Sequence, residues 1–291
     1  MSRFFVSPEQ VGANVITIED RNDLHHMKKV LRLAPGDEVD ISDGSSWEYR
    51  ARIEYLEADM AQLQILDKQS FATEPSTLVT LYQGIPKQGK METIIQKCVE
   101  LGVHRVVPVF MDRTVVVDKG NFHKKIDRWQ KVSAEAVKQC RRGIIPQVSD
   151  AMRMNEVLAE LNGTGGTGSA GVGSDAYAGS DAGAFDLVLI PYENEEGTTI
   201  KDVLRSFCPK AGDADAAAPG NTDTAAAPGP SDRNAPCRIA VLIGPEGGFS
   251  EEEVAKVTEA GGRSVSLGRT TLRTETAGMA ALAMIMYELE L

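Results

Sequence analysis

The chain of 291 residues lacks several features that define large classes of protein. No apolar run approaches the ~20 residues that a membrane-spanning helix needs, and the N-terminus has no hydrophobic stretch typical of a secretory signal. Its four cysteines are scattered without a C-x-x-C pair, so neither a disulfide framework nor a zinc site is predicted. We therefore expect a cytoplasmic protein with reduced thiols, no membrane association and no metal.

Common catalytic and nucleotide-binding signatures are also missing. The chain has no G-x-G-x-x-G fingerprint and no G-K-[ST] phosphate loop. It shows no Ser-His-Asp or Cys-His constellation, and its only adjacent histidines, His25 and His26, are too few for a metal site. If the protein is an enzyme, we expect group transfer from a bound cofactor rather than covalent catalysis.

Basic residues are in the minority, with 31 Lys and Arg against 42 Asp and Glu and a net charge of -11. Part of the acidic excess lies in two segments, about 163–183 and 211–236, which consist almost entirely of Gly, Ala, Ser, Thr, Asp and Pro. Such segments bury little apolar surface, so we expect surface insertions or disordered loops. The net charge argues only weakly against a nucleic-acid partner, because an acidic protein can still bind nucleic acid through basic residues that cluster on one surface.

Residues 1–73 are predicted to form a small β-barrel domain. Strand patterns recur at intervals of roughly ten residues, which is typical of small barrels. One short helix is expected over 23–33, ended by the Pro35-Gly36 pair that follows it. A hairpin turn is expected at 43–46. The expected strands cover residues 3–6, 14–18, 38–41, 48–53 and 61–66.

Residues 76–291 are predicted to form an α/β domain, because strand and helix patterns alternate and this order favours a largely parallel sheet. Expected strands cover 78–83, 105–110, 185–190, 238–243 and 263–267. Expected helices cover 89–101, 121–142, 250–260 and 274–291, the last apolar on nearly every side.

Polar, Gly-bearing loops follow three of these strands. The strongest signal is 241–250 (VLIGPEGGFS), where a buried strand meets a Gly-rich turn and a helix N-terminus. Ligands of open α/β sheets bind at such places. Residues 266–277 (SLGRTTLRTETA) and 191–195 (PYENE) could wall the same pocket. The alternatives are a tight connection without a ligand, helix capping by Thr274 and Glu275, and a solvated loop.

The helix expected over 121–142 carries a stripe of basic side chains. Residues 119–142 hold eight Lys or Arg against two acidic residues, and the charges fall on one face opposite Ile126 and Trp129. In an acidic protein, such a stripe favours a phosphate-backbone partner, although a solvated helix face is the alternative. The stripe consists of Lys124, Arg128, Lys131, Lys138 and Arg142.

Two segments together, 242–250 (LIGPEGGFS) and 267–277 (LGRTTLRTETA), resemble the S-adenosylmethionine-binding signature of the knotted SPOUT methyltransferases. More narrowly, the chain resembles the SPOUT family that makes N3-methyluridine in 16S rRNA. The resemblance covers nearly the whole chain, and further matching stretches are 3–6, 25–32, 87–92, 97–103 and 139–146. The two insertions are not expected of that family.

The resemblance implies a PUA-like β-barrel that binds RNA, followed by an α/β domain with a deep trefoil knot. It also implies a homodimer that acts on 16S rRNA of the small ribosomal subunit, with the cofactor held mainly by backbone atoms. The implied cofactor-binding residues are Pro191, Glu193, Leu242, Ile243, Gly244, Gly247, Leu267, Gly268, Leu272, Arg273, Thr276 and Ala277. The candidate RNA-binding residues are Arg3, Lys28, Lys29, Arg32, Lys124, Arg128, Lys131, Lys138 and Arg141.

The expected reaction needs stabilisation of negative charge at a uridine. N3 is a poor nucleophile until its proton leaves, and a positive group beside the ring then stabilises the anion. Arg142, which matches the family's Gln-Ser-x-Arg motif at residues 139–142, and Arg273 are the candidates; alternatively, both hold phosphate. Glu193 and Glu275 are weak candidates for a base. Action on another RNA such as tRNA, or RNA binding without catalysis, are the rival functions.

Overall fold

The computed structural model describes residues 3–44, 47–70, 74–87, 89–118, 120, 122–163, 184–208 and 236–291. Apart from Gly163 and Pro236, the two predicted insertions lie outside the described residues, as does part of the turn expected at 43–46. The chain divides into two compact units. The first comprises Met1–Glu74 together with Val137–Ile145, and the second contains the other described residues.

A curled five-stranded sheet forms the first unit, with the strand order β1-β3-β4-β5-β2. β1 pairs with β3 in parallel, and the other pairs are antiparallel. Two irregularities in the β4–β5 pairing, at Arg50/Ala51 and Ile53/Tyr55, bend the long strands. The strands are β1 (Arg3–Phe5), β2 (Val15–Ile18), β3 (Glu38–Ser42), β4 (Trp47–Leu56) and β5 (Ala61–Ser70).

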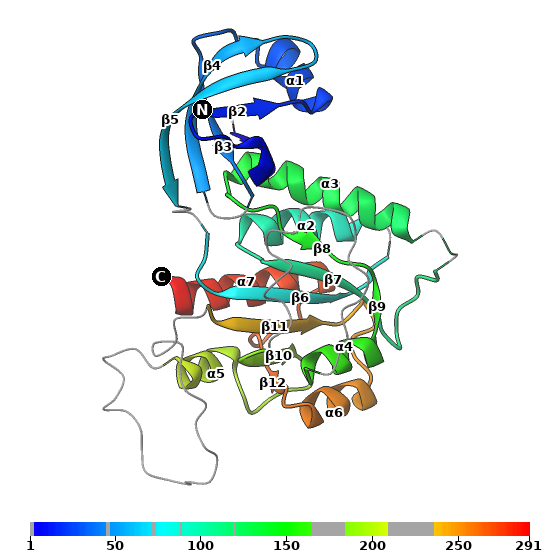
Figure 1. Cartoon of the computed structure of the whole chain (residues 1–291). Coiled ribbons are helices and arrows are strands. Elements are labelled where there is room, and N and C mark those ends of the chain that lie inside the picture. The colour runs from blue at the N-terminus through cyan, green and yellow to red at the C-terminus, as the bar shows by residue number, and fades with distance from the viewer. Residues whose placement is uncertain are drawn as a thin grey trace. The chain divides into compact units, whose positions relative to one another are not determined.

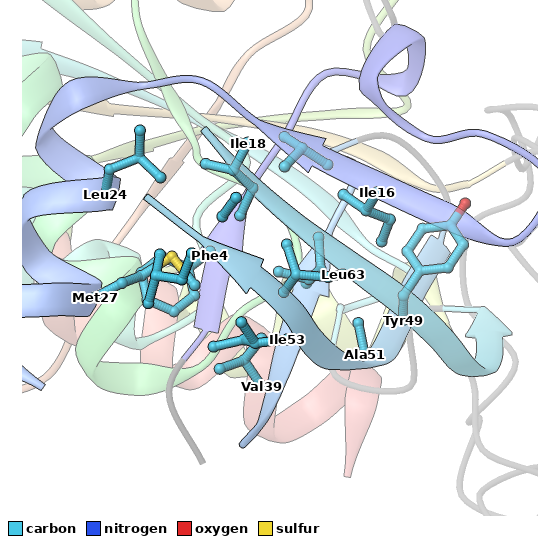
Figure 2. Close-up of a cluster of buried hydrophobic side chains, with 14 residues drawn as sticks. Phe4, Ile16, Ile18, Leu24, Met27, Val39, Tyr49, Ala51, Ile53 and Leu63 are labelled. Carbon is cyan, nitrogen blue, oxygen red and sulfur yellow. The ribbon is translucent and has the colours of Figure 1, made fainter. Parts of the chain in front are cut away.

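Apolar side chains at alternate strand positions form the core of the first unit (Figure 2). Ile16 and Ile18 of β2 meet Leu63 of β5, and Phe4 of β1 lies beside Met27. This period-2 pattern is the signal that predicts strands from the sequence, and all five expected strands are present with slightly different ends.

The helix expected over 23–33 was predicted with the wrong start and the wrong geometry. α1 (Arg21–His25) begins earlier, because the Asp20 side chain accepts hydrogen bonds from the backbone N–H groups of Asn22 and Asp23. The chain then continues as a π-helix, η2 (His26–Val30). A short 3-10 helix, η1 (Pro8–Gln10), lies between β1 and β2.

An all-parallel sheet forms the second unit, with the order β12-β10-β11-β6-β7-β8 and β9 beside β7 (Figure 1). The central strands are buried on both faces, as continuous apolar runs predict. The strands are β6 (Leu78–Gly84), β7 (Arg105–Phe110), β8 (Gln147–Val148), β9 (Met152–Arg153), β10 (Leu187–Pro191), β11 (Arg238–Ile243) and β12 (Arg263–Val265).

Seven α-helices are present in the described part of the chain, four of which were expected in the second domain. α4, α5, β8 and β9 were not expected, because they are too short to show a clear period. α7 lies against α2, α5, β6 and β11. The helices after α1 are α2 (Lys90–Glu100), α3 (His123–Cys140), α4 (Met154–Leu161), α5 (Ile200–Phe207), α6 (Glu251–Glu259) and α7 (Thr274–Glu290).

No helix within the described residues is long and apolar enough to span a bilayer. The described cysteines are all free thiols. Burial raises the pKa of the Cys98 thiol to about 12, so this thiol is a core side chain and not a nucleophile.

Candidate active site

Three polar loops meet at one edge of the sheet in the second unit. They follow β10, β11 and β12, which are neighbours in the sheet and run parallel, so their carboxyl ends share an edge (Figure 1). The backbone of Ser266 donates to the carbonyl of Thr198 at 2.8 Å, which joins two of the loops directly. The arrangement confirms that strand-end loops far apart in the sequence lie together in this fold.

A buried polar contact fixes the start of α7 against the ends of two strands. The Gln83 side-chain amide donates to Thr274 Oγ1 at 2.9 Å, and Thr274 Oγ1 donates to the carbonyl of Gly244 at 2.6 Å. No role for Gln83 was predicted from the sequence. The feature that could have indicated one is the presence of a polar residue at the end of the apolar strand 78–83, where a buried amide needs a hydrogen-bond partner.

Glycines allow the loop after β11 to approach its neighbours closely. A Cβ on Gly84 would lie 2.5 Å from the backbone nitrogen of Pro245, so only glycine fits there. Gly248 has a φ of 68°, and the carboxylate of Glu193 occupies the place where its Cβ would be. Glu193, which is exposed, therefore contacts the Gly-rich loop at the position predicted for it.

Lys90 connects two of the loops through ion pairs. Its ammonium lies 3.2 Å from a carboxylate oxygen of Glu246 and 3.2 Å from one of Glu275. The hydrogen bonds to these two carboxylates raise the pKa of Lys90, and the one to Glu275 has the larger effect. The backbone N–H of Lys87 also donates to Glu246 at 2.9 Å. Lys90 therefore holds the first turn of α7 and the Gly-rich loop to the start of α2.

Both carboxylates beside Lys90 are kept ionised. Burial raises the pKa of Glu246, but hydrogen bonds from its own backbone, from Lys87 and from Lys90 outweigh this and lower it. A hydrogen bond from its own backbone N–H is the largest effect on Glu275 and lowers its pKa. Desolvation opposes this, and the hydrogen bond and charge of Lys90 lower the pKa further. A carboxylate with a lowered pKa is a weaker base, so the position of Glu275 favours a structural role over proton abstraction.

The predicted cofactor-binding residues all lie on these three strand ends. Leu242 and Ile243 are buried, whereas Gly247, Gly268, Arg273 and Thr276 are exposed. The remaining members are Pro191 at the end of β10, Glu193 after it, Gly244 after β11, Leu267 and Leu272 between β12 and α7, and Ala277 in the first turn of α7. The structure brings the set together around the loops, and its role in cofactor binding stays a prediction.

Gly268 has a φ of 139°, which side chains other than glycine rarely adopt. A Cβ placed on it would meet no atom within 4 Å. Open space next to an exposed backbone segment suits a ligand held by main-chain groups, as the sequence predicted.

The basic stripe is present on α3, with one correction. Lys124, Arg128, Lys131 and Lys138 are exposed, and Ile126 and Trp129 are buried as expected. The prediction that Arg142 belongs to this exposed stripe is wrong, because α3 ends at Cys140 and Arg142 is buried.

Arg142 is held by a carboxylate within the first unit. Its guanidinium donates to Glu74 through Nε and a terminal nitrogen, the latter at 2.7 Å. The same carboxylate accepts the backbone N–H groups of Gly143 at 2.7 Å and Ile144 at 3.2 Å. The side chains of Arg142 and Glu74 are only 7% and 12% exposed. Sequence analysis assigned no role to Glu74, since a single acid before Pro75 carries no pattern.

The other predicted basic residues of the first unit differ in their accessibility. Arg3 forms a buried ion pair with Glu48 at 3.0 Å and donates to the carbonyl of Arg141. Lys28 is paired with Glu57 at 3.3 Å. Lys29, Arg32 and Arg141 are exposed. Arg273, the second catalytic candidate, is exposed at the N-cap of α7 in the second unit.

Among the residues that the structure describes, no group of three or more His, Cys, Asp or Glu could hold a metal ion.

Comparison with known proteins identifies the family of the chain. A family model described as an RNA methyltransferase domain matches residues 73–286, and one described as an RNA methyltransferase PUA domain matches residues 18–66. A protein named ribosomal RNA small subunit methyltransferase E from Bacillus subtilis is 27% identical and aligns with 100% of this chain and 98% of its own length. One of the same name from Synechocystis is 28% identical, with 99% of this chain and 78% of the relative aligned.

Solved structures show the same fold. The ribosomal RNA small subunit methyltransferase E of Neisseria gonorrhoeae, crystallised with S-adenosylmethionine, is 26% identical and superimposes with a TM-score of 0.69, covering 99% of this chain and 97% of that one. The predicted fold class, a SPOUT-type α/β domain preceded by a PUA-like domain, is confirmed. The chain belongs to the RNA methyltransferase family and carries that family's PUA domain before its methyltransferase domain.

Proposed function

We propose that the protein transfers the methyl group of S-adenosylmethionine to N3 of a uridine in 16S rRNA of the small ribosomal subunit. The observation that carries the proposal is the meeting of three strand-end loops, with open space beside Gly268, in a chain of the RNA methyltransferase family. The names of full-length relatives support the small-subunit substrate.

The residues of these loops fit S-adenosylmethionine. Gly247 and Gly268 are exposed, and each of their carbonyls accepts one side-chain hydrogen bond and can accept a second from an adenine or a ribose. The half-buried Leu272 offers apolar surface beside them. Glu193 supplies a carboxylate beside the Gly-rich loop. When bound, the sulfonium supplies an electrophilic methyl group, and the protein's task is to align the uridine with it.

The two arginine candidates differ in how they can act on the uridine. Arg273 is exposed beside the loops and can place its guanidinium near the negative charge that develops over N3, O2 and O4. Arg142 would have to leave its ion pair with Glu74 to do the same, and the carboxylate of Glu74 also holds the backbone N–H groups of residues 143 and 144. We therefore expect Arg273 to contact the substrate and Arg142 to position it.

A homodimer is part of the proposal. α7 leaves Met284 and Tyr287 exposed, with Tyr287 68% exposed, and its C-cap residue Leu291 is also exposed. Apolar residues exposed along one helix are typical of a subunit interface. Light scattering at micromolar concentration tests this, and a monomer would contradict it.

The reaction is tested by incubating the protein with tritiated S-adenosylmethionine and small ribosomal subunits that lack the modification, or with naked 16S rRNA. We expect label on one uridine, at N3, as mapped by nucleoside analysis. Label on tRNA but not on 16S rRNA would favour the rival substrate. Binding of RNA without any transfer would favour an RNA-binding protein that has lost catalysis.

A further inference from the structure

Two exposed arginines hold the left-handed backbone conformation that glycine usually takes. Among the described residues, Arg32 with φ 56° and Arg141 with φ 62° are the non-glycine residues with positive φ. Such a conformation is unfavourable for a side chain with a Cβ. Strained positions of this kind concentrate at functional sites, where another interaction requires the side chain.

Each arginine lies within two residues of the end of a helix. Arg32 follows η2 and its C-cap residue Leu31, and Arg141 follows the last residue of α3, Cys140. Backbone hydrogen bonds close both ends: Leu33 donates to the carbonyl of Met27 at 2.9 Å, and Arg141 donates to that of Val137 at 2.8 Å. Glycine is the residue that closes helices in this way without strain.

The surrounding structure fixes both backbones while leaving the guanidinium groups open. The Arg141 carbonyl accepts a hydrogen bond from Arg3, and the next residue, Arg142, is buried on Glu74. Before Arg32, Met27 is fully buried in the core of the first unit. Neither the Arg32 nor the Arg141 side chain has an ion-pair or hydrogen-bond partner within the described ranges, and both are exposed.

We propose that Arg32 and Arg141 are phosphate-contacting residues for the RNA substrate, each presented on a rigid helix end. This inference rests on the proposed function and names two of its substrate contacts. Arginine binds phosphate through a planar fork of donors, and a fixed backbone reduces the freedom lost on binding. A favourable interaction with the helix dipole is the competing explanation. At the end of α3 the nearby Lys138 is held in an ion pair with Asp23 at 3.4 Å, so the two explanations are separated by experiment.

Glycine variants separate the two explanations. Arg32→Gly and Arg141→Gly remove the charge and relieve the strain, so neither should lower the melting temperature. Each should weaken binding of a 16S rRNA transcript about threefold to tenfold at moderate salt, and reduce the slope of log affinity against log salt by about 0.7 to 1. Arg32→Lys and Arg141→Lys keep the charge and should retain most of the affinity.

Lys201→Ala is the matched control, because Lys201 is an exposed cation of α5 in the second unit and lies outside the proposed contacts. It should bind the transcript as the wild type does. If both glycine variants bind RNA as tightly as the wild type with an unchanged salt slope, the inference is overturned while the proposed function stands. If the wild-type protein neither binds nor methylates the rRNA, the proposed function itself fails.

Discussion

Gln83 and Thr274 are 191 residues apart in sequence, yet the Gln83 amide donates to Thr274 Oγ1 at 2.9 Å. Since Thr274 also donates to the Gly244 carbonyl, one hydroxyl links β6, the Gly-rich loop and α7. Gln83 and Thr274 are buried and Gly244 is half-buried, so water competes little for the hydrogen bonds among them. The shape of the proposed cofactor site therefore depends on this link.

Thr274→Val is expected to loosen the site. The change keeps the shape of the side chain but removes the hydroxyl, which leaves the Gly244 carbonyl without this donor. A loss of about 1–3 kcal/mol in the free energy of unfolding is expected, together with weaker S-adenosylmethionine binding. Urea unfolding and calorimetry measure the two effects. Thr274→Ser keeps the hydroxyl and should restore most of both; equal behaviour of the two variants would contradict the link.

Gly84→Ala is expected to displace the Gly-rich loop. The new Cβ would lie 2.5 Å from the backbone nitrogen of Pro245, which cannot move without the loop. Such overpacking destabilises by about 1–3 kcal/mol. Thermal unfolding measures the effect. Gly197→Ala is the control, because the nearest atom to its Cβ would be Glu195 Oε1 at 3.4 Å, close to ordinary contact distance, so the change should be nearly neutral. Similar melting temperatures for the two variants would contradict the packing argument.

The Lys90 ion pairs predict a defined dependence of stability on pH. Glu246 and Glu275 have pKa values lowered from the ordinary 4.5, so their contribution is present above pH 4.5 and is lost as the pH falls through the lowered values. The pKa of Lys90 is raised from 10.5, so its contribution is full below that pH and is lost as the pH rises through the raised value.

Lys90→Met tests this dependence. Urea unfolding of the variant should show a smaller loss of stability between pH 7 and pH 3 than the wild type shows, because the two carboxylates lose one donor that lowers their pKa values. Lys97→Met serves as the control, since the partner of Lys97 among the described residues is the exposed surface acid Glu100. An acid-induced loss that is the same in the Lys90 variant and the wild type would rule out the ion pairs as its source.

Glu74→Ala is expected to destabilise the first unit strongly. It leaves the buried Arg142 guanidinium and the backbone N–H groups of Gly143 and Ile144 without the carboxylate they share. Removing one partner of a buried pair costs about 3–5 kcal/mol. Chemical unfolding measures this.

A comparison of Arg142→Ala with Arg142→Lys then tests the positioning role. If Arg142 positions the substrate, the lysine variant should recover part of the RNA affinity while S-adenosylmethionine affinity stays unchanged in both. Unaltered methyl transfer by Arg142→Ala would remove Arg142 from the reaction.

Much of the fold could be predicted, because its signals are local. The apolar runs of β7 and β11 and the Ser250 cap of α6 lie entirely within short segments. The strand order could not be derived from such patterns, since which loops share a sheet edge depends on pairing between distant segments.

The predicted and the missed site residues differ for the same reason. The glycines of the loop after β11 were predicted because glycine carries a conformational meaning of its own. Gln83, Glu74 and the ion pairs of Lys90 were not predicted, because a polar residue acquires its role only from what the fold places beside it. Arg142 was placed on an exposed helix face because the period of α3 was extended two residues too far.

The most direct test of the central claim, that the three strand-end loops bind S-adenosylmethionine, is calorimetric titration of Gly268→Ala and Gly261→Ala. Both glycines have positive φ, and a Cβ on either would meet no atom within 4 Å. Gly261 precedes β12 and so lies at its amino end, whereas Gly268 lies beyond its carboxyl end among the loops.

Each variant should lose about 1–3 kcal/mol of stability through backbone strain. We predict that the wild type and Gly261→Ala bind S-adenosylmethionine with similar affinity and that Gly268→Ala binds at least tenfold more weakly. Equal affinity in all three proteins, or no binding by the wild type, would contradict the assignment of the site.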